Sequence, residues 1–174
     1  MKTIRLTAVA CALLFGMSSA ARAETTVELK GTHLCCGACV KAVADTLKKI
    51  DGVTGKCDQK AKTVTITAKD DATAQKAIDA LVEAGFSGTT DSEKVKVKED
   101  SGVKAGKVKS LTLTGVHNCC GQCTNAIKAT LKKVDGVKGD TVKAKADTFD
   151  VTGDFDAEAV VKALNAAGFH VKAK

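Results

Sequence analysis

The chain repeats a nine-residue loop that holds three cysteines and a histidine, and this repeat limits the folds that the chain can adopt. The first copy reads Gly-Thr-His-Leu-Cys-Cys-Gly-Ala-Cys over residues 31–39, and the second reads Gly-Val-His-Asn-Cys-Cys-Gly-Gln-Cys over residues 115–123. Each copy ends a short apolar strand and opens an amphipathic helix. Each half of the chain therefore gathers thiols and an imidazole at a helix N-terminus, which is typical of a metal site.

Around the first loop, the sequence predicts the element order β-α-β-β-α-β. Strands are expected at residues 26–31, 53–59 and 63–68 and from Phe86 onward. The first helix follows the loop and stops at Asp51-Gly52, because this pair breaks the helical pattern. The second helix is capped by Asp70-Asp71 and ends at Gly85. Both helices carry one apolar face, so both are expected to pack against the sheet.

The second half repeats the apolar positions of the first half with nearly constant spacing. Corresponding pairs are Val27 and Leu111, Leu29 and Leu113, Leu47 and Leu131, Val64 and Phe149, Ile66 and Val151, and Phe86 and Phe169. The sequence therefore predicts the α+β class, with two tandem ferredoxin-like βαββαβ domains, each an antiparallel sheet with two helices on one face. The first domain is expected at residues 24–90 and the second at residues 108–174, joined by a polar linker at residues 91–107.

Residues 1–23 have the pattern of a secretory signal peptide. Basic residues precede an apolar run, and a small-residue cleavage site ends at Ala23. The run is shorter than the roughly 20 residues that cross a bilayer, and no later stretch is apolar enough to do so. The sequence thus predicts a periplasmic or secreted protein that has no membrane span after cleavage.

The composition argues against a nucleic-acid partner. Both arginines, Arg5 and Arg22, lie in the leader, and the chain has no tryptophan or tyrosine. Nucleic-acid sites rely on arginine forks and stacking aromatic rings. The many lysines are therefore interpreted as a solvated surface.

Seven of the eight cysteines remain once the leader is removed, because Cys11 lies within it. Disulfides are the default in an exported protein, but the odd number and the two tight clusters favour metal or redox chemistry. Cys57 has no counterpart in the second half and is expected to be a packed thiol. His170 is expected on the surface, because strand alternation points it away from the inward Phe169.

Each loop contains a Cys-x-x-Cys pair whose sulfurs lie close enough to share one ion. The pairs are Cys36 with Cys39 and Cys120 with Cys123. Free backbone N–H groups and the helix dipole stabilise thiolates at this position. Soft thiolates favour Cu(I) and also suit Zn²⁺. Two thiolates give Cu(I) a near-linear site, whereas tetrahedral Zn²⁺ needs four ligands.

Further candidate metal ligands lie beside each pair. They are Cys35 and His33 in the first loop and Cys119 and His117 in the second. For the two histidines, a ligand role and a surface role stay open. A shared centre, in which the two three-cysteine clusters face each other and hold several Cu(I) ions, is also compatible with the sequence.

With these elements in order, each repeat resembles the heavy-metal-associated domain of copper chaperones, P-type ATPases and the periplasmic mercury-binding protein. The metal-binding pair of its Gly-Met-x-Cys-x-x-Cys motif corresponds to the two Cys-x-x-Cys pairs of this chain, and its aromatic residue near the metal loop is similar to Phe86 and Phe169. The resemblance implies Cu(I) as the metal, with zinc or mercury as other soft ions. It also implies a cysteine-bearing metal transporter or acceptor protein as partner.

The two loops depart from the family motif in the same places. A histidine stands at the motif's glycine position, and an extra cysteine precedes each metal-binding pair. The motif's methionine, which packs beneath the loop, is replaced by Leu34 in the first copy and by Asn118 in the second. Leu34 can imitate that packing, whereas Asn118 is a poorer substitute.

The sequence favours a non-enzymatic, exported protein that sequesters or delivers a soft metal by thiolate exchange. A periplasmic thiol-disulfide oxidoreductase is an alternative, although the chain has no proline and so lacks the cis-proline that faces thioredoxin-like active sites. A redox or metal sensor that closes a strained Cys35-Cys36 disulfide is a third interpretation. No other catalytic constellation is present in the sequence.

Overall fold

The computed structural model describes residues 24–174, so the expected leader at residues 1–23 lies outside the described residues. The first domain consists of β1 (Thr25–Lys30), α1 (Gly37–Leu47), β2 (Val53–Asp58), β3 (Thr63–Ala68), α2 (Asp71–Glu83) and β4 (Thr89–Thr90). The second consists of β5 (Lys107–Thr114), α3 (Gly121–Leu131), β6 (Val137–Asp140), β7 (Phe149–Asp156), α4 (Ala157–Ala166) and β8 (Lys172–Ala173). Both domains have the expected βαββαβ order.

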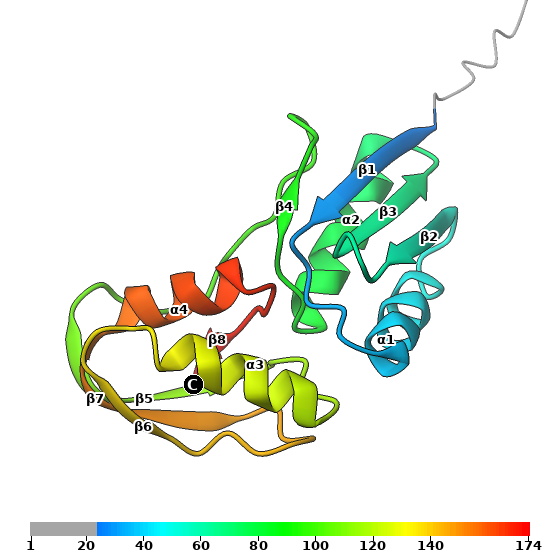
Figure 1. The fold of residues 1–174 in the computed structure, drawn as a ribbon. Coiled ribbons are helices and arrows are strands. Elements are labelled where there is room, and N and C mark those ends of the chain that lie inside the picture. Colours follow the sequence, from blue (N-terminus) through cyan, green and yellow to red (C-terminus); the bar gives the residue numbers. More distant parts are fainter. Residues whose placement is uncertain (1–23) are drawn as a thin grey trace, which may run out of the picture.

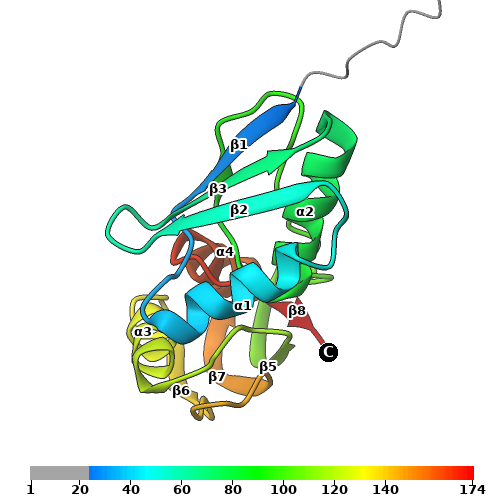
Figure 2. The ribbon, with the colours of Figure 1, turned by 90° about the vertical axis from the view of Figure 1, so that its right-hand side faces the viewer.

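Each domain is built on a four-stranded antiparallel sheet. The strand orders are β2-β3-β1-β4 and β6-β7-β5-β8. Leu29 lies opposite Val64 in the first sheet, and Leu113 lies opposite Phe149 in the second, as the repeat predicts. The predicted α+β fold with two ferredoxin-like domains is confirmed. Helices α1, α3 and α4 lie between the two sheets (Figures 1 and 2).

The four helices begin in two different ways. Helices α2 and α4 are capped by Asp70 and Asp156, whose carboxylates accept hydrogen bonds from backbone N–H groups at 2.7 and 2.9 Å. Helices α1 and α3 begin after Cys36 and Cys120, and neither side chain makes a capping hydrogen bond to the helix. The first turns of the two cysteine-bearing helices therefore keep N–H groups that can stabilise a thiolate.

The two domains share one continuous core. Its buried apolar residues come from both sheets and from all four helices, and they include Leu29, Ile78, Leu113 and Leu164. None of the helices described between residues 24 and 174 is long and apolar enough to cross a membrane.

Phe86 and Phe169 were each expected to open the fourth strand of their own domain, and this expectation is wrong for these two residues. They pair with each other across the domain boundary in an isolated antiparallel bridge, and the edge strands β4 and β8 begin three residues later. The His170 N–H donates to the Gly85 carbonyl at 3.0 Å, and the Ser87 N–H donates to the Gly168 carbonyl at 3.1 Å. Pairing between the domains satisfies backbone groups that each sheet leaves unpaired.

The glycine of each Gly-Phe turn lies against the cysteine loop of the other domain. Gly85 and Gly168 both have a φ of +86°, and they end α2 and α4 as the sequence predicts. A Cβ atom at Gly168 would lie 2.3 Å from the backbone nitrogen of His33. A Cβ atom at Gly85 would lie 2.2 Å from the backbone nitrogen of His117. Only glycine permits this approach of the two backbones.

Residues 91–106 connect the last strand of the first domain to the first strand of the second. Val95 is fully buried, and Lys94 forms an ion pair with Asp71 at 3.1 Å. Further along, Ser101 accepts a backbone hydrogen bond from Ala173 at 2.7 Å. The segment thus makes contacts with both domains.

His170 is buried rather than exposed, so the expectation of a surface position is wrong. Its side chain is 2% exposed, and neither ring nitrogen has a hydrogen-bond partner. Strand alternation fails here because His170 lies beside the bridge between the domains, where the other domain covers the outer side of the strand. Burial lowers the pKa of the imidazole; Lys172 lowers it further, whereas Glu83, Glu99 and Asp100 oppose this effect.

We expect Gly168→Ala to destabilise the metal-free protein more than Gly31→Ala. Both glycines have positive φ, so both substitutions add backbone strain, but a Cβ at Gly31 meets no atom within 4 Å. The clash at residue 168 should add about 1–3 kcal/mol. Urea unfolding of both variants measures the difference. Equal losses of stability would contradict the close backbone contact between the domains.

The buried His170 should make stability depend on pH. Its pKa is lowered in the folded state, so the unfolded chain binds a proton more readily. This contribution to stability is complete above the unfolded pKa of about 6.5 and is lost as the pH falls below it. Thermal unfolding of the wild type and of His170→Gln between about pH 7.5 and about pH 5.5 tests this. The wild type should lose more stability on acidification than the variant, and parallel losses would contradict the assignment.

Candidate metal centre

The two cysteine loops meet at the boundary between the domains. Each loop leaves the end of the first strand of its domain and turns into a helix, α1 or α3, so that the helix N-termini face one another. All six loop cysteines are free thiols in the structure. The two clusters of three cysteines, one in each repeat, therefore lie together, as the shared centre left open by the sequence requires.

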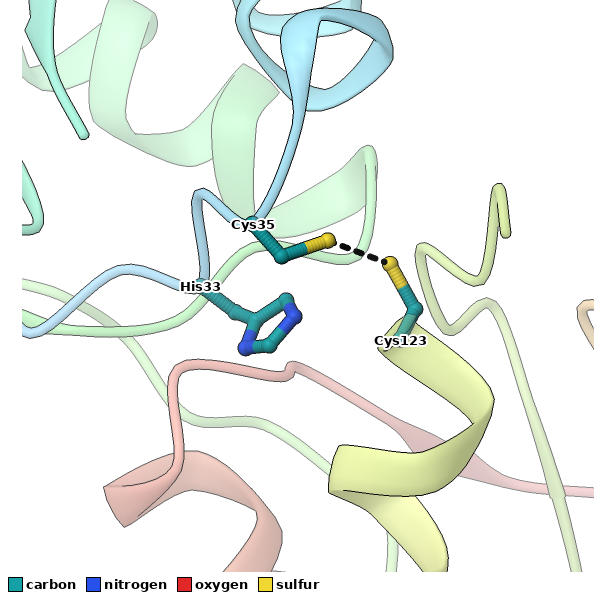
Figure 3. Close-up of side chains that lie close together, drawn as sticks. All are labelled: His33, Cys35 and Cys123. Carbon is teal, nitrogen blue, oxygen red and sulfur yellow. Dashed lines mark hydrogen bonds between the residues drawn. The ribbon is translucent and has the colours of Figure 1, made fainter. Parts of the chain in front are cut away.

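The six sulfurs form a compact group. Ten pairs of Sγ atoms lie between 3.4 and 3.9 Å apart, and six of these pairs join the two domains. The shortest separation, 3.4 Å, joins Cys35 to Cys123 across the boundary (Figure 3). Within each Cys-x-x-Cys pair the Sγ atoms are 3.9 Å apart. Contacts between the domains are thus as short as those within a loop.

The two histidines are held by the aromatic ring of the opposite domain. His33 stacks on Phe169 with ring centroids 4.2 Å apart, and His117 stacks on Phe86 at 4.4 Å. The Nε2 atom of each histidine is buried without a hydrogen-bond partner. A ring nitrogen of His33 lies within 4.8 Å of the sulfurs of Cys35 and Cys123 (Figure 3).

The centre is buried on one side and partly open on the other. Cys39 and Cys123, which lie in the first turns of α1 and α3, are fully buried. The remaining four sulfur-bearing residues are half-buried. These four cysteines, which include Cys36 and Cys120 just before the two helices, are therefore accessible to an incoming ion or thiol.

Mutual contact controls the protonation of these thiols. The pKa of Cys39 is lowered, first because the Cys123 thiol donates a hydrogen bond to it, and the pKa of Cys123 is raised by the same contact. Burial raises the pKa of Cys119 to about 12. The pKa of Cys120 is lowered to about 7, first by the Cys123 backbone N–H at the start of α3. The sequence predicted that free backbone N–H groups at a helix start lower the pKa of a loop cysteine, and this effect acts on Cys120.

Asn118 takes the packing position beneath the second loop in a way that the sequence did not predict. It is 5% exposed, and its side-chain nitrogen donates to the carbonyls of Lys143 and Ala146 at 2.7 and 3.2 Å. Its side-chain oxygen accepts a hydrogen bond from Thr124 at 2.9 Å. Leu34, its counterpart in the first loop, is a buried apolar residue. The second loop is supported by polar contacts where the first is supported by packing.

Cys57 lies away from the centre. It is on β2 opposite Val64, half-buried, and burial raises its pKa. It belongs to none of the candidate ligand groups found among residues 24–174.

The second domain matches the model of a known family over residues 112–170, described as the heavy-metal-associated domain. Residues 112–170 are therefore similar to the heavy-metal-associated domain. The matched residues include the second cysteine loop, α3 and α4. The first domain shares the element order, the sheet order and the loop of this domain. The family resemblance is thereby confirmed for the second repeat.

Solved structures with similarity to the chain include two single domains and one longer protein. The copper binding domain from HMA7, a P-type ATPase, is 23% identical, with a TM-score of 0.36, and the match covers 38% of this chain and 95% of that one. A chain from a structure titled "Crosstalk between Cu(I) and Zn(II) homeostasis" is 22% identical, with a TM-score of 0.34, covering 38% and 100%. The N-terminal soluble domains of Bacillus subtilis CopA are 19% identical, with a TM-score of 0.32, covering 88% and 95%. Among curated proteins, no relative matches the sequence.

Sequence reasoning missed the residues that join the two halves of the centre. Phe86 and Phe169 were expected to lie near the cysteine loop, but the structure places each against the histidine of the opposite loop. Repetition of the Gly-Phe pair was the only signal of this role. That signal identifies a repeated core position and carries no information on which loop the ring contacts.

We expect Asn118→Leu to destabilise the second domain, although leucine occupies the same position in the first. The substitution removes three side-chain hydrogen bonds, to the carbonyls of Lys143 and Ala146 and from the Thr124 hydroxyl, each worth about 0.5–1.5 kcal/mol. Leu34→Met, which conserves volume, is the matched control and should cost less than about 1.5 kcal/mol. Chemical unfolding of the metal-free variants measures both. An Asn118→Leu protein as stable as the wild type would show that packing alone supports the second loop.

Proposed function

We propose that this chain is an exported Cu(I)-binding protein that sequesters copper or delivers it by thiolate exchange. The observation that carries the proposal is the convergence of six free cysteine thiols from two domains at separations of 3.4–3.9 Å. Such a purely sulfur-rich site suits a soft ion. The heavy-metal-associated domain supports metal binding in general.

The donor set favours Cu(I) over zinc. The four candidate ligand groups found among residues 24–174 each offer three donor atoms, and three of these groups consist of cysteines alone. Structural Zn²⁺ sites are almost always tetrahedral, with four ligands. Three thiolates in a triangle satisfy Cu(I), so copper uses the site without a further ligand.

Half-buried sulfurs support exchange with a partner. A cysteine-bearing transporter or acceptor protein could approach Cys36 and Cys120, which lie on the open side of the centre. Its thiolates would replace those of this chain one at a time.

The leader sequence supports export to the periplasm or beyond. Fractionation of expressing cells, with N-terminal sequencing for cleavage after Ala23, tests that part of the proposal.

The binding proposal is tested by anaerobic titration of reduced residues 24–174 with Cu(I) in competition with a chelator. Uptake should be tight in the wild type and strongly weakened in the Cys36→Ser/Cys120→Ser double variant, because the variant loses one thiolate from each Cys-x-x-Cys pair. A parallel titration with Zn²⁺ should show weaker binding.

Cys57→Ser is the control for loss of a thiol away from the centre and should bind copper like the wild type. If the reduced wild type does not compete for Cu(I), the metal-binding proposal is wrong. Rapid formation of disulfides when oxidised glutathione is added to the metal-free protein as the oxidant would then favour thiol redox chemistry.

A further inference from the structure

The contacts among the six sulfurs have the pattern of an octahedron. Ten pairs lie at 3.4–3.9 Å, and two more, Cys35 with Cys36 and Cys119 with Cys120, lie within 4.8 Å. Each sulfur thus has four neighbours. The three remaining pairs share no residue, as the opposite corners of an octahedron require. They are Cys35 with Cys119, Cys36 with Cys123, and Cys39 with Cys120.

The triangular faces of this octahedron have the size of a trigonal metal site. A thiolate–metal bond of about 2.3 Å, the zinc value, sets a sulfur–sulfur distance of about 4.0 Å when the ion lies at the centre of a triangle. The face formed by Cys35, Cys39 and Cys123 has edges of 3.4, 3.6 and 3.9 Å. The face formed by Cys36, Cys39 and Cys119 has edges of 3.6, 3.7 and 3.9 Å.

Only alternate faces can be filled at the same time. Two faces that share an edge would place their ions closer together than the length of a metal–sulfur bond, whereas alternate faces share a single sulfur. An octahedron has four alternate faces. The three all-cysteine ligand groups found in the described chain belong to one such set, and the face of Cys35, Cys39 and Cys123 completes it.

We infer that the two domains together hold one cluster of four Cu(I) ions, in which each of the six thiolates bridges two ions. This inference rests on the proposed function and replaces two single-ion sites, one per Cys-x-x-Cys pair, with a single shared centre. The extra cysteines, Cys35 and Cys119, are then equal members of the cluster. They explain why each loop carries three thiols rather than two.

The charge and the surroundings fit such a cluster. Six thiolates and four Cu(I) ions leave a net charge of −2, and each thiol releases its proton to solvent as its sulfur binds.

Cys39 and Cys123 form one edge of the octahedron and are fully buried. The opposite edge is formed by half-buried Cys36 and Cys120, so copper enters and leaves there. His33, with Nε2 buried and unpaired, flanks the cluster beside Cys35 and Cys123.

Native mass spectrometry of residues 24–174 during anaerobic Cu(I) titration tests the cluster. The monomer should pass from the metal-free form to a form with four copper ions, with little of the one- and two-copper forms, because bridging thiolates couple the sites. Cys35→Ser removes a thiolate that lies outside both Cys-x-x-Cys pairs and should end this joint uptake. Cys119→Ser is its counterpart in the second loop, and Cys57→Ser is the control that should keep four ions.

Two outcomes would overturn the inference, and they are distinguishable. If the wild type binds two ions in separate steps, and Cys35→Ser and Cys119→Ser bind two as well, the domains act independently while the proposed copper binding stands. If the wild type takes up no Cu(I), the proposed function fails together with the cluster. Circular dichroism of each variant shows whether a loss of copper comes from loss of the fold.

Discussion

The crossed contact between the two domains determines the geometry of the whole centre. Each Gly-Phe turn lies against the cysteine loop of the other domain, with the glycine backbone in contact with the loop and the ring stacked on its histidine. A backbone bridge between Phe86 and Phe169 joins the two turns. These contacts hold the two helix N-termini face to face. The same boundary brings the sulfurs of the two loops into contact.

This arrangement changes what the cysteine loop can do chemically. A lone Cys-x-x-Cys pair offers two thiolates, which suit an ion that is passed on quickly. Six thiols in contact offer triangles of donors. In the proposed cluster, each ion would be held by three sulfurs and each sulfur would bridge two ions. The proposed cluster would store copper in a reduced, enclosed form, and the half-buried edge at Cys36 and Cys120 would leave a route for exchange.

The sequence predicted the fold of each domain well because the information is local. Alternating apolar residues, the Asp70 cap and the glycines that end α2 and α4 all act within a few residues of their position. The six cysteines that meet at the domain boundary were all named as candidate ligands by their place in the loop, and a shared centre was recognised as possible. The sequence could not decide between separate and shared sites, because that depends on how two domains pack. The burial of His170 was missed for the same reason, since the covering surface comes from the other domain.

The most direct test of this account is X-ray absorption at the copper edge of the loaded protein. A shared cluster predicts copper with about three sulfur neighbours and a clear copper–copper scattering contribution, because bridged ions lie close together. Copper with two sulfur neighbours and no copper–copper contribution would contradict the account. It would show that the two loops bind their ions separately, despite the contact between their sulfurs in the structure.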